Sequence, residues 1–257
     1  MCFHVIAHRG ASGYAPENTL PAFRRALEIG AVEVELDVQQ SADGVLVLFH
    51  DRILDEKTDL SGPVRQHAAA DLEAADVGTW FDTAHPEVAT RYAGTGLARL
   101  DTVLAEFGPR LHYHVELKSR EPELPDLVLA AFRRAELVER ATITSSDFGQ
   151  LSRVRVSSPD SPVCWLLHSA LPRGERAGES LASEQRAQVD RAASAGFGMV
   201  AVRARELTPE IVEYAEDRGL QLRAFAIKGD LDMERAISAG ANGMTIDWPD
   251  LLLERMR

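Results

Sequence analysis

Apolar positions along the chain follow two spacings, one typical of strands and one typical of helices. The strand-like runs lie at residues 3–8, 32–38, 111–117, 141–146, 162–167, 198–203, 220–226 and 243–247. Helical stretches lie between them, at 19–29, 100–108, 122–137, 147–156, 180–195, 208–218 and 231–239. Eight strands separated by helices over 257 residues predict an α/β fold of the (β/α)8 TIM-barrel type, which typically takes about 250 residues. A doubly wound open sheet is the alternative, but no glycine-rich dinucleotide fingerprint follows any of these strands.

An additional apolar run at 45–50 follows the second strand after only six residues, too few for a crossover helix. The Asp43-Gly44 pair between the two runs is a strong hairpin signal. We therefore expect residues 45–50 to fold back on an extension of the second strand. With the weakly periodic stretch that follows, they form a small insertion at about 45–98 in a single barrel domain that spans residues 1–257.

Two of the predicted strands carry a polar face. Its members are Glu33, Glu35, Asp37 and Gln39 in one strand and His112, His114, Glu116 and Lys118 in the other. The apolar face of a barrel strand packs against the helices, so these polar faces point into the barrel, where unpaired carboxylates are costly. An edge strand with one face in water is the alternative. Near the carboxyl ends of the strands, where barrel active sites lie, Glu35, Asp37 and Glu116 offer three oxygen ligands that suit Mg²⁺ or Ca²⁺.

Histidines and cations are expected beside these carboxylates. If Asp43-Gly44 is a two-residue turn, His50 lies opposite Asp37 on the same face. His8 ends the first strand, which neighbours the second in a barrel. Two histidines that flank a metal-bound group can serve as general acid and base. Arg9 offers a forked donor to phosphate oxygens, and Lys118 offers a point charge.

The composition limits the classes of partner that the protein can bind. The net charge of −12 speaks against nucleic acid and against anionic membranes. The sequence has two cysteines. It has no basic leader and no apolar run of about 20 residues, so we expect a cytoplasmic protein without a membrane span. Such an acidic protein would repel a phosphate-bearing substrate unless the local field at the site is reversed.

The chain also contains, in this order, Ala7-His8-Arg9-Gly10, Pro16-Glu17-Asn18-Thr19, Glu35-Leu36-Asp37, Asp43-Gly44, His50-Asp51, Glu116-Leu117-Lys118 and Asp247-Trp248-Pro249-Asp250. Together these motifs resemble the glycerophosphodiester phosphodiesterase family over nearly the whole chain. The resemblance implies a (β/α)8 barrel with an insertion after the second strand. It also implies hydrolysis of a small glycerophosphodiester to glycerol 3-phosphate and an alcohol, with one divalent cation, Mg²⁺ or Ca²⁺, as cofactor.

Carried over by position, the resemblance implies roles for ten residues. The metal ligands are Glu35, Asp37 and Glu116, the acid/base pair is His8 and His50, the substrate contacts are Arg9 and Lys118, and the bracing residues are Glu17, Asn18 and Asp51. Two stretches depart from the family pattern. Glu56-Lys57-Thr58 stands where the family has Arg-Thr-Thr, and Phe225-Ala226-Ile227-Lys228 stands where it has Trp-Thr-Val-Asn. Both departures bear on how the glycerol or alcohol end is held.

Several questions stay open at this level: which histidine is the acid, whether water or the substrate's own hydroxyl attacks, the alcohol moiety and the oligomeric state. A lysophospholipase D-like phosphodiesterase and a non-catalytic phosphodiester-binding barrel are the alternative functions. A sugar isomerase barrel is less favoured, because its chemistry gives no role to Arg9 or His50.

Overall fold

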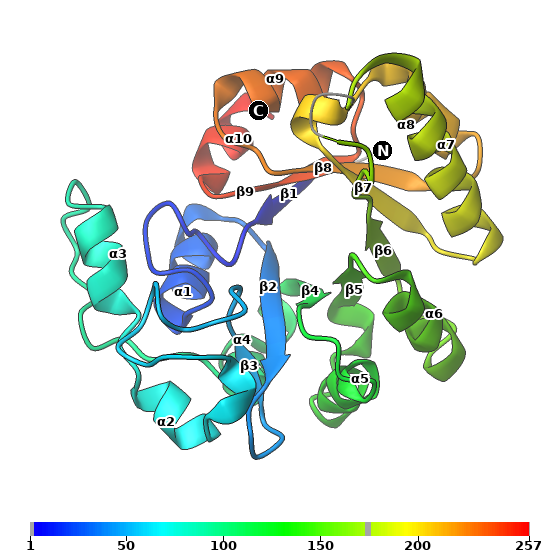
Figure 1. Ribbon diagram of the computed structural model, residues 1–257. Coiled ribbons are helices and arrows are strands. Elements are labelled where there is room, and N and C mark those ends of the chain that lie inside the picture. The colour runs from blue at the N-terminus through cyan, green and yellow to red at the C-terminus, as the bar shows by residue number, and fades with distance from the viewer. Residues whose placement is uncertain (1–2, 173–175, 257) are drawn as a thin grey trace.

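The computed structural model describes residues 3–172 and 176–256. Within these residues eight parallel strands form a closed barrel: β1 (His4–Ala7), β2 (Glu33–Gln40), β4 (His112–Leu117), β5 (Ala141–Ser145), β6 (Val163–Leu166), β7 (Met199–Arg203), β8 (Gln221–Phe225) and β9 (Gly243–Ile246). Neighbours pair in parallel around the ring, and β1 closes it by pairing with both β9 and β2 (Figure 1). The predicted (β/α)8 barrel is therefore confirmed, and the open sheet is ruled out.

Helices surround the strands on the outside of the barrel (Figure 1). They are α1 (Leu20–Ile29), α4 (Leu100–Phe107), α5 (Leu124–Arg134), α6 (Phe148–Ser157), α7 (Gly178–Ser194), α8 (Pro209–Glu216), α9 (Asp230–Ser238) and α10 (Pro249–Arg255). Local sequence explains their ends: in α1 the Thr19 side chain caps the amino end and Gly30, at a φ of 94°, terminates the carboxyl end. Helix α10 is the one barrel helix that the periodicity did not predict, since its apolar run is short.

Short 3₁₀ helices complete the connections: η1 (Val64–Gln66), η2 (Gly108–Arg110), η3 (Val138–Arg140) and η5 (Ala204–Glu206). None of the helices in the described ranges is long and apolar enough to cross a membrane.

The ninth strand, β3 (Leu46–Leu48), pairs antiparallel with the far end of β2, as the hairpin signal predicted. Its register differs by one residue from the prediction, because the loop has three residues rather than two. Ser41 pairs with Val45, and the Ser41 hydroxyl accepts a hydrogen bond from the Val45 N–H at 2.9 Å. Gly44, at a φ of 82°, supplies the left-handed residue that such a loop requires. Phe49, not His50, therefore lies opposite Asp37, and its N–H donates to the Asp37 carbonyl at 3.0 Å.

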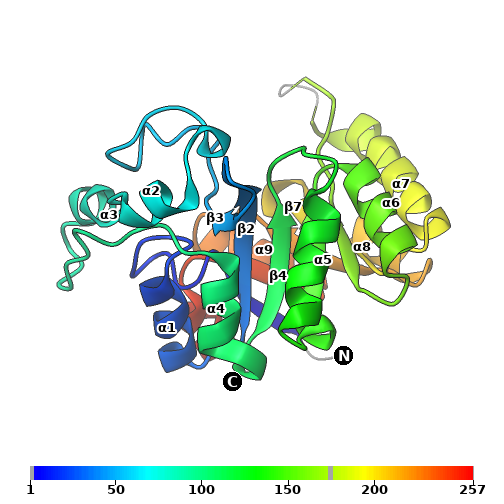
Figure 2. The same cartoon turned by 90° about the horizontal axis from the view of Figure 1, so that it is seen from below.

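The segment after β3 adds two further helices, α2 (Ala69–Ala74) and α3 (Gly78–Ala84), beside the barrel. It has a small apolar core of its own, which includes Val47, Phe49 and Leu72. Figure 2 shows α2 and α3 next to β3, near the end of the barrel toward which β2 runs. The insertion therefore supplies one side of the barrel mouth.

The polar faces of β2 and β4 point into the barrel, and their apolar faces are buried beneath the helices, as with Val34, Leu36 and Val115. Strand β2 lies between β1 and β4, and β4 lies between β2 and β5. The alternative of edge strands with a wet face is therefore wrong. The barrel interior is unusually polar, and the functional site has to be sought there.

Candidate active site

Three carboxylates gather at the carboxyl end of β2 and β4. Asp37 is paired in register with Glu116, and Glu35 lies two residues before Asp37 on the same face. One oxygen of each of the three side chains lies within 4.8 Å of the other two. The sequence-based prediction that these groups lie together is supported by this geometry. Three oxygen ligands in such a small space are the donor set of a hard divalent cation.

Hydrogen bonds orient these carboxylates without satisfying all of their oxygens. Asp37 is fully buried; its Oδ2 accepts from Asn18 Nδ2 at 2.8 Å and pairs with Arg9 Nε at 3.0 Å. Glu35 Oε2 accepts from the Arg9 backbone N–H at 3.0 Å, but Glu35 Oε1 is buried and has no hydrogen-bond partner among the described residues. A buried, unsatisfied carboxylate oxygen is costly, and a bound cation would satisfy it.

The charges of the three groups oppose one another. Burial, followed by the charges of Asp37 and Glu116, raises the pKa of Glu35 well above its usual value. Burial also raises the pKa of Glu116, although Lys118 opposes the shift. Burial would raise the pKa of Asp37 too, but Lys118 and Arg9 outweigh it and hold this pKa well below the usual range. The positive charges of Arg9 and Lys118 therefore compensate the carboxylate of Asp37 more fully than that of Glu35.

His8 lies at the end of β1, where an aspartate orients its ring. The Nδ1–H of His8 donates to Asp247 Oδ1 at 2.5 Å, and the Ser12 hydroxyl donates to the same oxygen at 3.0 Å. This contact fixes the ring and directs Nε2 away from Asp247. The sequence contained Asp247 as part of a family motif, but no role was predicted for it. Its position just after β9 is the signal that was missed, since β9 neighbours β1 in the closed barrel.

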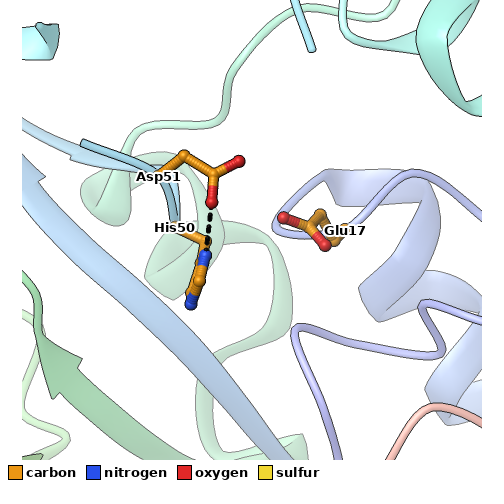
Figure 3. Close-up of side chains that lie close together, drawn as sticks. All are labelled: Glu17, His50 and Asp51. Atoms are coloured by element: carbon orange, nitrogen blue, oxygen red, sulfur yellow. Dashed lines mark hydrogen bonds and ion pairs between the residues drawn. The ribbon is translucent and has the colours of Figure 1, made fainter. Parts of the chain in front are cut away.

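His50 is oriented in the same way by its neighbour in the chain. Its Nδ1–H donates to Asp51 Oδ1 at 2.6 Å, as Figure 3 shows, and Glu17 lies nearby. Lys57 Nζ contacts Glu17 Oε1 and Asp51 Oδ2, both at 2.8 Å, and packs 4.9 Å from the centre of the Trp80 ring. The His50 hydrogen bond, together with Lys57, holds the pKa of Asp51 well below its usual range.

Lys57 was not predicted as a site residue, although it belongs to one of the two stretches that depart from the family pattern. Glu17, His50 and Asp51 bring ligand atoms within 4.8 Å of one another. Because the Lys57 ammonium already contacts both carboxylates, this second acidic cluster is compensated from within the protein.

Arg9 and Lys118, the two cationic side chains predicted to contact the substrate, are both held by carboxylates. Arg9, at a φ of 55°, pairs through Nη1 with Glu17 at 2.8 Å and through Nε with Asp37. Lys118 Nζ lies 2.6 Å from Glu116 Oε1 and 3.2 Å from Asp37 Oδ1. Both cations are therefore positioned by the carboxylates they neutralise.

A cavity of about 330 Å³ opens at this end of the barrel. Of the residues predicted for metal, substrate and acid/base roles, it is lined by His8, Arg9, Glu35, His50, Glu116 and Lys118. Asp37 is buried and is not among the lining residues. The one-residue change in hairpin register thus did not remove His50 from the site, because the chain leaves the ladder after Leu48. The far wall, which the sequence did not identify as a unit, includes His168, Arg203, Arg223, Phe225 and Lys228.

Comparisons with known proteins identify a family that this chain resembles in both sequence and fold. The model of the glycerophosphoryl diester phosphodiesterase family matches residues 8–251. A glycerophosphodiester phosphodiesterase of Bacillus subtilis (strain 168) is 31% identical over 260 residues, which cover 96% of this chain and 84% of the relative. A crystal structure of a protein from Silicibacter pomeroyi DSS-3, assigned as a glycerophosphoryl diester phosphodiesterase, has a TM-score of 0.83 at 30% identity and covers 96% of this chain and 90% of its own.

A third likeness concerns the fold alone. The phosphodiesterase OLEI02445 of Oleispira antarctica, solved in complex with its product sn-glycerol-3-phosphate, has a TM-score of 0.80 at 24% identity. The match covers 97% of this chain and 94% of that one.

Proposed function

Because this chain belongs to the glycerophosphoryl diester phosphodiesterase family, we propose that it hydrolyses glycerophosphodiesters with one divalent cation and two histidines, His8 and His50. The resemblance seen in the sequence motifs is thereby confirmed, and the protein is an enzyme of the phosphoric diester hydrolase class. The cation, the acid/base pair and the substrate contacts are the proposal.

The observation that carries the proposal is the carboxylate cluster with its unsatisfied oxygen. Glu35, Asp37 and Glu116 would hold the cation, and within the part of the chain that the structure describes Glu35 Oε1 has no hydrogen-bond partner. All three are hard oxygen donors, which fit Mg²⁺ or Ca²⁺ and not a metal that prefers sulfur or nitrogen. When bound, such a cation supplies Lewis-acid stabilisation of charge on the phosphoryl oxygens.

The histidines supply proton transfer. Each ring gives its Nδ1–H to a carboxylate, Asp247 for His8 and Asp51 for His50. In the neutral ring Nε2 is then left as the acceptor, and a proton taken up there is stabilised by the carboxylate behind the ring. One histidine removes the proton from the attacking hydroxyl, and the other donates a proton to the leaving alcohol oxygen. Either order of roles, and attack by water or by the glycerol hydroxyl, is consistent with this arrangement.

Arg9 and Lys118 would bind the phosphate from the metal side of the cavity. Both are cations that line the cavity and are already oriented by Asp37 and Glu116. A site preorganised in this way loses little rotamer entropy on binding. It also answers the charge problem, since the local field of these groups and the cation opposes the overall charge of −12.

The test measures release of glycerol 3-phosphate from glycerophosphocholine by the purified protein. Activity should vanish with EDTA, return with Mg²⁺ or Ca²⁺, and fall at least about 100-fold in His50→Ala. A lysophospholipid assayed in parallel distinguishes the lysophospholipase D-like alternative. Full activity in EDTA or in His50→Ala would contradict the proposal, and binding without turnover of any phosphodiester would leave only the non-catalytic alternative.

A further inference from the structure

His50 lies just beyond the point where the ladder between β2 and β3 ends. Strand β3 stops at Leu48, and the Phe49 N–H makes the last contact of the ladder, with the Asp37 carbonyl at 3.0 Å. Among the described residues, no backbone N–H donates to the carbonyl groups of Phe49 and Asp51, which flank His50 in the chain. Because an unpaired backbone carbonyl away from water is costly, this segment needs donors from elsewhere.

The Gln39 side chain supplies both donors. Its Nε2 donates to the Phe49 carbonyl at 2.7 Å and to the Asp51 carbonyl at 2.8 Å. Both acceptors are carbonyl oxygens, so it is the NH₂ group of the Gln39 amide that faces them, and each of its two hydrogens has an acceptor. Gln39 is 8% exposed and is not among the residues that line the cavity. It can therefore act on a substrate only through the segment that it holds.

Gln39 connects this segment to the strand that carries two of the proposed cation ligands. Alternation along β2 places Glu35, Asp37 and Gln39 on the same inward face. Strand β2 is paired on both sides, with β1 and β3 along one edge and with β4 along the other. Side chains that project from such a strand are held more precisely than those on a loop. The two Gln39 hydrogen bonds therefore tie His50, which follows the strand in a loop, to the rigid element of the site.

The contacts of the His50 ring depend on the same main chain. The Nδ1–H donates to Asp51 Oδ1 at 2.6 Å, and Asp51 Oδ2 pairs with Lys57 at 2.8 Å. These contacts orient the ring relative to Asp51, but they involve no atom of β2. The Gln39 bond to the Asp51 carbonyl does. The side-chain contacts thus set the direction of the ring, and the Gln39 contacts set its distance from the proposed cation ligands.

We propose that Gln39 is a positioning residue for the reaction, which holds His50 at a fixed distance from the proposed cation ligands by bonding both carbonyl groups that flank it. This inference rests on the proposed function, because that function gives His50 its acid/base role. A displacement of a catalytic group by about 1 Å can lower a rate about 100-fold. Loss of the Gln39 hydrogen bonds should therefore lower kcat. KM should stay nearly unchanged, because Arg9 and Lys118 keep their contacts with the substrate phosphate.

The test compares Gln39→Met with Gln40→Met. Methionine has about the length of glutamine but no N–H donor, and Gln40, the next residue of β2, lies on the opposite face of the strand. For release of glycerol 3-phosphate, Gln39→Met should lower kcat about 30-fold and change KM less than about threefold, whereas Gln40→Met should keep both within about twofold. Gln39→Glu keeps the side-chain shape without the NH₂ donor and takes the place of Gln39→Met if that variant does not fold.

Two further measurements separate an effect on His50 from an effect on β2. In a His50→Ala background, Gln39→Met should cause no further loss of activity, because residues that act as a unit are not additive. Calorimetric titration with Ca²⁺ alone should give the same affinity for Gln39→Met as for the wild type, since Glu35 and Asp37 keep their places.

Wild-type kcat in Gln39→Met, or an equal loss in Gln40→Met, would overturn the inference and leave the proposed function intact. A further loss in the His50→Ala background, or weaker Ca²⁺ binding by Gln39→Met, would overturn it as well. If no phosphodiester is hydrolysed, the proposed function fails, and NMR decides the inference separately. The ring C–H signals of His50, identified by their absence from His50→Ala, should shift in Gln39→Met and not in Gln40→Met. Unshifted signals in Gln39→Met would overturn the role of Gln39.

Discussion

The two ends of the barrel interior are built from the same kinds of residue and behave differently. At the amino end, Glu33 accepts hydrogen bonds from His4 Nδ1 at 2.8 Å and from His114 Nε2 at 2.9 Å. At the carboxyl end, two residues along the same strand, one buried oxygen of Glu35 has no hydrogen-bond partner in residues 3–172 and 176–256. Burial would raise the pKa of both carboxyls, but the histidine hydrogen bonds hold the pKa of Glu33 far below its usual range, while nearby Asp37 and Glu116 add to the rise for Glu35. In this barrel the proposed cation site therefore coincides with the carboxylates that are incompletely paired among the described residues.

The largest predicted effect comes from exchanging one carboxylate for its amide at each end. Glu116→Gln should lower kcat/KM about 1000-fold or more, because it removes a proposed cation ligand. Glu33→Gln should keep activity within about tenfold and instead lower the free energy of unfolding by about 2–3 kcal/mol, since it removes charged hydrogen bonds to two histidines. Glycerol 3-phosphate release and urea unfolding measure the two effects. Comparable loss of activity in both variants would show that the two ends do not differ as described.

The next largest effect is expected from replacing one of the carboxylates that orient the histidines. Asp247→Asn removes the charge that orients His8 and would stabilise its protonated form, so kcat should fall about 100-fold with little change in melting temperature. Asp250→Asn is the matched control, because Asp250 accepts from the Tyr14 hydroxyl and contacts neither histidine. Equal activity in the two variants would contradict the role of Asp247.

Variants of Lys57 test whether its ammonium group takes the place of a bound cation beside Glu17 and Asp51. Lys57→Met leaves Glu17 and Asp51 uncompensated beside His50, and we expect kcat to fall about tenfold with KM nearly unchanged, as a positioning effect on His50. Lys57→Arg keeps the charge and should recover most of the activity. A loss of the same size in the arginine variant would mean that side-chain shape, not charge, is what matters at this position.

The smallest effect concerns Cys164, which lines the cavity and is 3% exposed. Burial raises the pKa of its thiol to about 11. A raised pKa keeps the thiol protonated at pH 8, so in a Cys2→Ser variant the folded protein should react negligibly with iodoacetamide there. Reaction should increase only as the pH approaches 11. Rapid alkylation at pH 8 would show that the Cys164 thiol is open to solvent.

Sequence reasoning predicted the barrel and the polar rows for a specific reason. Alternation places every second side chain of a strand on the same face, so Glu35 and Asp37 had to point the same way, and the helices determined which way that was. The hairpin register was wrong because it depends on the Ser41 side chain closing a three-residue loop, a contact that alternation does not encode. Lys57 was missed for a similar reason, since its partners Glu17 and Asp51 are distant in sequence from one another.

By itself, the sequence determined the strands, their inward faces, the metal-ligand candidates and the two histidines, because each follows from local periodicity or from short motifs. Only the tertiary structure decided which of these polar groups are satisfied. Pairing across the barrel joins His8 to Asp247 and His114 to Arg223, contacts between residues more than 100 positions apart. The closed ring also brings side chains of β8 to the same cavity as side chains of β4.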